Sequence, residues 1–261
     1  MLKILFIGDI CGSGGRRCVA ELLPGLKAEL AADMVVANAE NAAGGVGLTS
    51  KLAGELFLAG VEVITTGNHV WRHAELLSLL DEEPHLLRPA NYPPGVAGHG
   101  HVVARTAGGV RVGVLNLEGR VFMSNLDCPF RAADELLAGP LADADVVVVD
   151  IHAEATSEKQ ALGWYLDGRV GAVIGTHTHV PTADQRVLPG GTAYITDIGL
   201  TGPHESVIGM RREQAIGRFL TQKPTRFQPA TGDRRLQGAL VTLDPAEGLA
   251  VDIERVERRL D

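Results

Sequence analysis

The stretch that decides the fold lies near the middle of the chain: Val170-Gly171-Ala172-Val173-Ile174-Gly175-Thr176-His177-Thr178-His179-Val180. Its first part is a short apolar run with β-branched residues, which is typical of a strand buried on both faces. Two histidines, His177 and His179, follow at alternate positions. Alternate positions of an extended chain point the same way, and neutral imidazole is the commonest side-chain metal ligand. The stretch therefore predicts a buried strand that ends in metal ligands.

Six further apolar runs of this kind occur along the chain, and helix-like segments separate them. Helical spacing of apolar residues predicts helices over 17–30, where Pro24 must kink or restart the helix, over 52–59 and over 74–80. Residues 157–160 have the form of a capping box and predict a further helix start. This alternation predicts an α/β fold with helices packed on a sheet. The expected strands are residues 4–8, 34–38, 61–66, 110–117, 146–151, 170–175 and 193–196.

Two regions depart from this alternation. Residues 88–100 are rich in proline and glycine and predict a loop. From Gly191 onward the pattern indicates a strand, a loop, a helix and finally two strands, 239–243 and 249–256, joined by turn residues. We expect this tail to form an antiparallel addition to the core. No repeat or interdomain linker interrupts the sequence, so residues 1–261 are expected to form a single domain.

Composition and charge narrow the class of protein. The net charge of -8 argues against nucleic-acid binding through a basic face, although metal ions can supply positive charge locally. Three scattered cysteines, Cys11, Cys18 and Cys128, favour a reducing compartment over a disulfide framework. No apolar run reaches the about 18 residues of a membrane span, and the N-terminal run is too short for a signal peptide. We expect a soluble cytoplasmic protein, and its apolar content permits a homo-oligomer.

Good metal ligands follow four other predicted strands as well. In open α/β sheets, ligands bind outside the carboxyl ends of the strands, where loops converge. Carboxylate, amide and imidazole groups at five such ends would share one crevice, and this set suits a pair of metals such as iron, manganese or zinc. The residues are Asp9, Glu40, Asn41, Asn68, His69, His152, His177 and His179.

Most of these residues have a simpler explanation when each is taken alone. Asp9 could cap the following segment, Asn68 could be a turn residue, and His152 could be a hydrogen-bonded structural histidine. Residues 40–41 could lie in a solvated loop. Only the histidine pair favours ligation in isolation. Five coincidences at equivalent topological positions are harder to explain than one shared site.

The glycine-rich run Gly12-Ser13-Gly14-Gly15-Arg16 has a rival interpretation, a phosphate site at a helix N-terminus. It lacks the G-x-G-x-x-G register of dinucleotide-binding folds and the Gly-Lys-Ser/Thr of a P-loop. We therefore predict a tight turn that lets loops approach the metals. Glu154, Lys159 and Arg169 are groups that support the ligands, groups that contact the phosphate, or surface charges around a helix.

Several motifs resemble the ordered motifs of the calcineurin-like metallophosphoesterases, and more narrowly those of the YmdB-like bacterial branch. The likeness extends over essentially the whole chain. It implies a four-layer αββα sandwich and a dinuclear, di-iron phosphodiesterase acting on 2',3'-cyclic nucleotides. The motifs are 7–10, 38–42, Gly67-Asn68-His69, 152–159, 161–165, 175–180 and 197–203.

The resemblance also implies a role for each residue of the set. Glu40 would bridge the two metals and His69 would be the general acid. The remaining ligands would divide into Asp9, Asn41 and His179 for one metal and Asn68, His152 and His177 for the other.

Three positions depart from the broad superfamily. Cys11 stands where a histidine is usual, the bridging carboxylate is Glu40 instead of an aspartate, and Val70 replaces an acidic residue. The change at Cys11 removes a nitrogen ligand, which Asn41 can replace. The role of Cys11 itself stays open.

The implied chemistry is hydrolysis by a hydroxide that bridges two metals about 3.5–4 Å apart. His69 would then protonate the departing ribose oxygen. The expected substrate is a small-molecule phosphodiester, and an RNA end is the one nucleic-acid alternative. Two other functions stay open: a regulatory nucleotide- or phosphate-binding protein with incidental catalysis, and a phosphomonoesterase.

Overall fold

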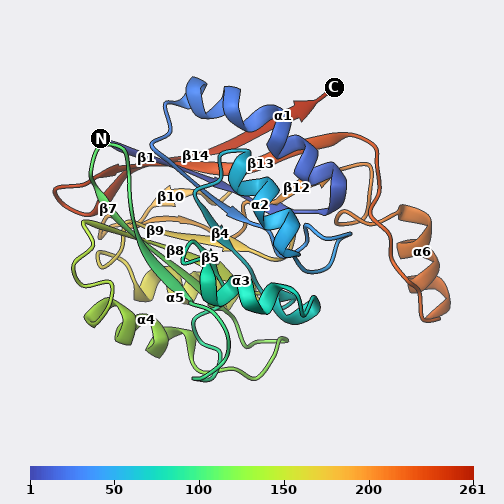
Figure 1. Cartoon of the computed structure of the whole chain (residues 1–261), viewed down its shortest axis with the longest axis horizontal. Coiled ribbons are helices and arrows are strands. Elements are labelled where there is room, and N and C mark those ends of the chain that lie inside the picture. Colours follow the sequence, from blue (N-terminus) through green and yellow to red (C-terminus); the bar gives the residue numbers. More distant parts are fainter.

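The computed structural model describes residues 1–261 as two β-sheets that pack face to face between layers of helices (Figure 1). A cluster of 21 buried apolar residues lies between the two sheets. A second cluster joins the first sheet to its helices, and a third joins the second sheet to its own. These three cores separate four layers, so the predicted αββα sandwich is confirmed. The single domain over residues 1–261 stays a prediction.

The first sheet has eight strands, and four neighbouring strands that reach one of its edges are parallel. The parallel strands are β1 (Leu2–Ile7), β3 (Met34–Asn38), β4 (Val63–Thr65) and β5 (Leu86–Leu87). The other strands are β2 (Asp9–Ile10), β12 (Leu200–Pro203), β13 (Arg234–Asp244) and β14 (Leu249–Leu260).

The second sheet has six strands, with a parallel centre and one antiparallel strand at each edge. Its parallel strands are β7 (Arg111–Glu118), β8 (Val146–His152), β9 (Ala172–Thr176) and β11 (Ala193–Ile195). The edge strands are β6 (His101–Arg105) and β10 (Arg186–Val187).

Helices cover the outer face of each sheet. The first sheet carries α1 (Gly12–Leu30), α2 (Ser50–Leu58) and α3 (Leu76–Glu82), and a short 3-10 helix spans Val70–Arg72. The second sheet carries α4 (Pro129–Ala138) and α5 (Thr156–Tyr165). The sixth helix, α6 (Arg212–Thr221), stands apart from both layers (Figure 1). No helix combines the length and the apolar character that crossing a bilayer requires.

Alternation along β1 shows why these runs of apolar residues become buried strands. Leu5 and Ile7 contact the helical layer, whereas Ile4 and Phe6 face the second sheet. Successive side chains of a strand point to opposite faces, so a strand between two apolar layers needs apolar residues throughout. The same requirement explains β3 and β8, which are buried at every position.

The prediction of a tight turn at Gly12–Arg16 is wrong, because this run forms the first turns of α1. Gly15 is needed there for packing and not for a turn: a Cβ would lie 2.3 Å from the Thr201 carbonyl oxygen of β12. The absent side chain lets the helix approach the sheet. Pro24 lies inside the same helix, so it does not restart it.

The predicted capping box at Ser157 is also wrong. Helix α5 begins one residue earlier, after Ala155, and no side chain caps it. Glu158 instead accepts hydrogen bonds from the backbone N–H groups of Arg120 and Val121, at 3.0 and 3.1 Å. The acidic residue of the motif therefore anchors a neighbouring loop.

The C-terminal hairpin is not an addition at the margin of the core. Its first strand, β13, pairs antiparallel with β1 on one side and with β14 on the other. The parallel strands leave one edge of β1 open, and β13 satisfies the backbone groups there. The antiparallel hairpin itself is confirmed.

Candidate metal centre

The predicted site residues come from the carboxyl ends of strands in both sheets. Asp9 follows β1, residues 40–41 follow β3, and residues 68–69 follow β4 in the first sheet. His152 ends β8, and residues 177–179 follow β9 in the second sheet. Because the two sheets pack face to face, these ends meet at one edge of the sandwich. The structure brings all eight predicted side chains together there.

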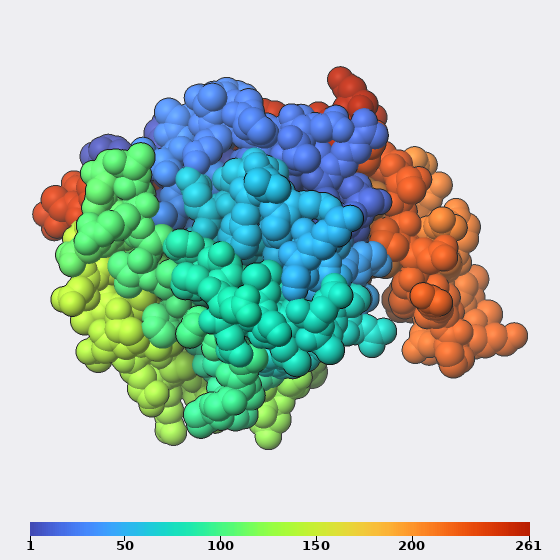
Figure 2. Space-filling view, viewed as in Figure 1, coloured from blue at the N-terminus to red at the C-terminus, as the bar shows by residue number.

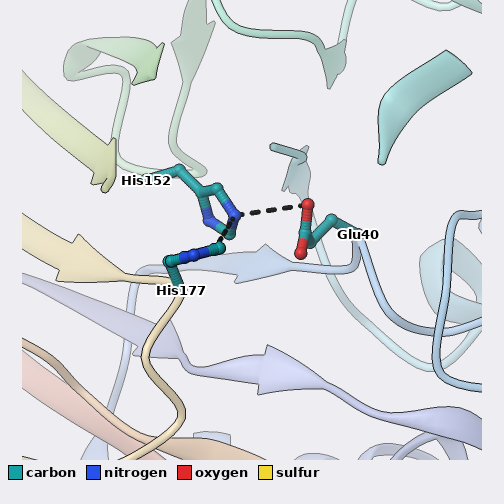
Figure 3. Close-up of side chains that lie close together, drawn as sticks. All are labelled: Glu40, His152 and His177. Carbon is teal, nitrogen blue, oxygen red and sulfur yellow. Dashed lines mark hydrogen bonds and ion pairs between the residues drawn. The ribbon is translucent and has the colours of Figure 1, made fainter. Parts of the chain in front are cut away.

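Glu40, His152 and His177 form the tightest group (Figure 3). Each offers one ligand atom, and these atoms all lie within 4.8 Å of one another. His152 Nε2 is 3.2 Å from Glu40 Oε2 and 3.0 Å from His177 Nδ1. Asn68 Oδ1 joins the group at 3.1 Å from His152 Nε2. The four side chains therefore surround a single small volume.

Asp9, Asn41 and His179 lie beside this group. His179 Nε2 is 3.7 Å from Asp9 Oδ1 and 3.0 Å from Asn41 Nδ2. The amide of Asn41 thus presents its nitrogen, which also donates to Glu40 Oε1 at 2.9 Å. A cation would favour the amide oxygen instead, which a flip of the amide provides. Asp9 Oδ1 is buried and has no hydrogen-bond partner.

Hydrogen bonds behind the histidines fix which ring nitrogen faces the group. The Thr176 hydroxyl donates to Asp150 Oδ1 at 2.8 Å and therefore accepts from His152 Nδ1 at 2.9 Å. This arrangement leaves His152 Nε2 pointing at its neighbours. Such outer partners are typical of metal-binding histidines, whose ring orientation they set.

The other two histidines are fixed in the same way. His177 Nε2 lies 3.1 Å from Glu154 Oε2, so Nδ1 faces His152. His179 Nδ1 donates to the Ile208 carbonyl oxygen at 2.9 Å, so Nε2 faces Asp9. Two imidazole lone pairs that face each other repel unless a cation lies between them. Together with the unpartnered Asp9 oxygen, this donor set fits a metal site.

Burial and neighbouring charges shift the pKa values of several side chains in the group. Burial raises the pKa of Asp9 to about 6. Burial alone would lower the pKa of His152, but the nearby carboxylates, Glu40 foremost, raise it to about 9. Burial, together with the charge of His152, lowers the pKa of His177 to about 3.

His69 lies at the open side of the group. Its Nδ1 is 3.1 Å from both Glu40 Oε1 and Asn41 Oδ1, and its backbone N–H donates to Glu40 Oε2. Its side chain is 36% exposed, more than that of Glu40, His152, His177, His179 or Asp9. His69 is therefore more accessible to a substrate than these five residues.

A cavity of about 410 Å³ opens onto this side of the cluster. Its polar side carries Glu40, Asn41, His69, Glu154 and the residues 177–179. Its apolar lining consists of Val46, Ile208, Met210 and Phe227, with two glycines of the loop after β3. A ligand there would contact the metal-binding groups and an apolar wall together.

Comparison with known families identifies the chain. The model of the family described as YmdB-like protein matches residues 5–256. The chain belongs to the YmdB-like family. This confirms the family that the motifs resemble.

Relatives within the YmdB-like family cover nearly the whole chain. A 2',3'-cyclic-nucleotide 2'-phosphodiesterase of Bacillus subtilis (strain 168) is 49% identical over 255 residues, which cover 98% of this chain and 96% of the relative. The predicted enzyme class matches the activity named for that protein.

Two solved structures show the same fold. A hypothetical protein from Thermus thermophilus superposes with a TM-score of 0.93 and 44% identity, and 99% of each chain is covered. A protein from Mycoplasma pneumoniae described as a novel phosphatase has a TM-score of 0.92 and 36% identity, covering 99% of this chain and 93% of its own.

Sequence reasoning left a supporting role for Lys159 open but missed its buried partner, Asp197. Lys159 Nζ lies 2.8 Å from Asp197 Oδ2, and both side chains are fully buried. The same carboxylate oxygen accepts from the Thr178 backbone N–H at 3.1 Å and from its hydroxyl at 2.7 Å. The pair therefore holds the segment that carries both histidines, and Lys159 is not a surface charge.

Three further charged residues differ in their position relative to the site. Asp150 stands within an otherwise apolar strand, and that position was the available signal for its role behind His152. Glu154 contacts His177, as the supporting role requires. Arg169 pairs with Asp134 at the surface, so it is a surface charge.

Cys11 is buried next to the cluster. Burial raises the pKa of its thiol to about 12, with the charge of Asp9 adding to the effect. A thiol ligates metals as the thiolate, and this environment favours the neutral form. Without a bound cation, the Cys11 thiol is therefore neutral.

Proposed function

We propose that this chain is a metal-dependent phosphodiesterase that hydrolyses 2',3'-cyclic nucleotides. The observation that carries the proposal is the convergence of three oriented imidazoles and the unpartnered Asp9 oxygen at the end of the sandwich. The activity named for the Bacillus subtilis relative supports the choice of substrate.

Two metal ions are proposed, each held by one subset of the cluster. Glu40, whose two oxygens face different neighbours, would contact both ions. When bound, such ions polarise phosphate oxygens and lower the pKa of a water molecule. A donor set of imidazole, carboxylate and amide without thiolate suits iron, and also manganese or zinc. The subsets are Asp9, Asn41 and His179 for one ion and Asn68, His152 and His177 for the other.

His69 is proposed as the general acid. Its Nδ1 lies 3.1 Å from Glu40 Oε1, which as a carboxylate oxygen can only accept, and therefore keeps its own proton. Nε2 is then the nitrogen left to give a proton to the departing ribose oxygen. His69 lines the cavity and its side chain is 36% exposed, which supports a role in protonating a leaving group there.

The test is hydrolysis by protein that has been stripped of metal and reloaded with iron, manganese or zinc. We expect turnover of 2',3'-cyclic AMP and of bis-p-nitrophenyl phosphate. His69→Ala should slow turnover by about 10²- to 10⁴-fold, because a general acid contributes about that much. Metal content, measured by elemental analysis, should be unchanged.

His85→Ala is the matched control, since His85 is a partly exposed histidine outside the cavity. Wild-type inactivity with all three metals would contradict the proposal. Tight nucleotide binding without turnover would favour the regulatory alternative. Preferential cleavage of p-nitrophenyl phosphate over the diesters would favour a phosphomonoesterase.

A further inference from the structure

The apolar wall of the cavity is built by a segment that protrudes from the sandwich. We call residues 204–231, which include α6, the arm; Figure 2 shows it in orange at one side of the molecule. Three of the four apolar residues on the wall, Ile208, Met210 and Phe227, belong to the arm. The part of the arm nearest the cluster therefore shapes the cavity.

The base of the arm is fixed relative to the histidines. The Ile208 carbonyl oxygen accepts from His179 Nδ1. Two backbone hydrogen bonds of 2.9 Å tie the two sides of the arm together, from Arg211 to Gln228 and from Ala230 to Gly209. A Cβ on Gly45 would lie 2.7 Å from Met210 Cε, so the arm packs closely on the loop after β3. The apolar residues of the arm are therefore held in a fixed position beside the histidines.

Phe227 is the largest side chain on this wall. It is 43% exposed although it lines a cavity, so part of its ring is available to a ligand. None of the four wall side chains is charged or carries a hydrogen-bonding nitrogen or oxygen. The wall therefore offers apolar and aromatic contact without polar groups that would read a ligand's edge.

We propose that Phe227 is the stacking platform for the nucleobase of the substrate, with Ile208 and Met210 completing an apolar subsite. This inference rests on the proposed function, which places the phosphodiester at the metal cluster. With the phosphodiester at the cluster, the base is the planar part of the substrate that remains to contact the apolar residues lining the same cavity. Every base has a π face, so stacking without polar contacts accepts purines and pyrimidines alike.

The test compares two cyclic phosphates with the metal-loaded enzyme. One is 2',3'-cyclic AMP, and the other is the 2',3'-cyclic phosphate of methyl riboside, which has no base. Phe227→Ala should lower kcat/KM for 2',3'-cyclic AMP by about 5- to 150-fold, the range that loss of base stacking produces. The substrate without a base should change by less than about twofold, and Phe227→Trp should retain activity on both.

Phe219→Ala is the matched control, because Phe219 lies on the same arm, is 75% exposed and does not line the cavity. The Kd of adenosine 3'-monophosphate, measured by calorimetry, should weaken in Phe227→Ala by a similar factor. Equal losses on both substrates, or no loss on 2',3'-cyclic AMP, would overturn the subsite. Failure of the wild type to cleave either compound would instead count against the proposed function, and the calorimetric comparison would still decide the stacking.

Discussion

Lys159 shows how one side chain controls the position of residues that it does not touch. It is fully buried, and Asp197 is its only anionic partner. A buried charge without a partner is costly because it loses its hydration and gains nothing in return. Since Asp197 also binds Thr178, the ion pair connects α5 to the segment between the two histidines.

Lys159→Met should lower the free energy of unfolding by about 3–5 kcal/mol, because it leaves Asp197 buried and uncompensated. Urea denaturation of the metal-free protein measures the change. Lys51→Met, at an exposed position, should change stability by no more than about 0.5 kcal/mol. Wild-type stability in Lys159→Met would show that the pair contributes little.

Site residues could be predicted from the sequence where they directly follow a predicted strand. The ligand candidates stood out because each follows a recognisable strand, and strand order then places them together. Lys159 could not be distinguished from a surface lysine, because its burial depends on how α5 packs against β9. Asp150 was more accessible to prediction, since a carboxylate inside an apolar strand needs partners.

Glycines decide how closely the helices and strands approach one another. Gly15 in α1 lies against the backbone of β12, where a Cβ would be 2.3 Å from the Thr201 carbonyl oxygen. A Cβ added to Gly54 in α2 would meet no heavy atom within 4 Å. The two residues look equivalent in sequence, since both are helical glycines, but only one is required by packing.

Gly54→Ala should raise the free energy of unfolding by about 0.5–1 kcal/mol, because alanine loses less backbone entropy in a helix. Gly15→Ala should lower it, since α1 must move away from β12. Guanidinium denaturation of both variants beside the wild type compares them directly. A stabilised Gly15→Ala would refute the packing argument.

Elements were predictable where the period of apolar residues was clear. Strand β3 has the predicted bounds, and β8 differs only by including His152. The start of α1 was missed because its small and polar residues gave no helical pattern, and the reason for them lies in β12. Local composition does not report a close approach made by a distant strand.

The candidate metal ligands come from both sheets of the sandwich. Asp9 begins β2 of the first sheet and Glu40 and Asn68 lie in loops of that sheet, whereas His152 and the histidine pair belong to the second. An ion bound by both sets would oppose separation of the sheets. Binding to the folded state alone stabilises a protein by an amount that grows with ligand concentration.

Saturation with metal at about 100 times its Kd should stabilise the protein by about 2.7 kcal/mol. The corresponding rise in Tm is about 5–10 °C for a chain of this size. Thermal denaturation with and without a chelator measures it, and His152→Ala should remove most of the rise. An unchanged Tm in the wild type would contradict a site shared by both sheets.

The sandwich as a whole was predictable from its motifs, but the place of the C-terminal hairpin was not. The turn at 244–248 reveals that β13 and β14 pair with each other. Nothing local reveals that β13 also pairs with β1, because that contact joins opposite ends of the sequence.

This pairing has a consequence for synthesis of the chain. Leu2 of β1 lies opposite Leu243 of β13. The first sheet therefore cannot be completed until β13 has been synthesised. Contacts so distant in sequence form late, and a chain emerging from the ribosome meets them only near the end. We expect a nascent chain that lacks β13 to contain every ligand residue and the whole arm, yet to have no assembled site.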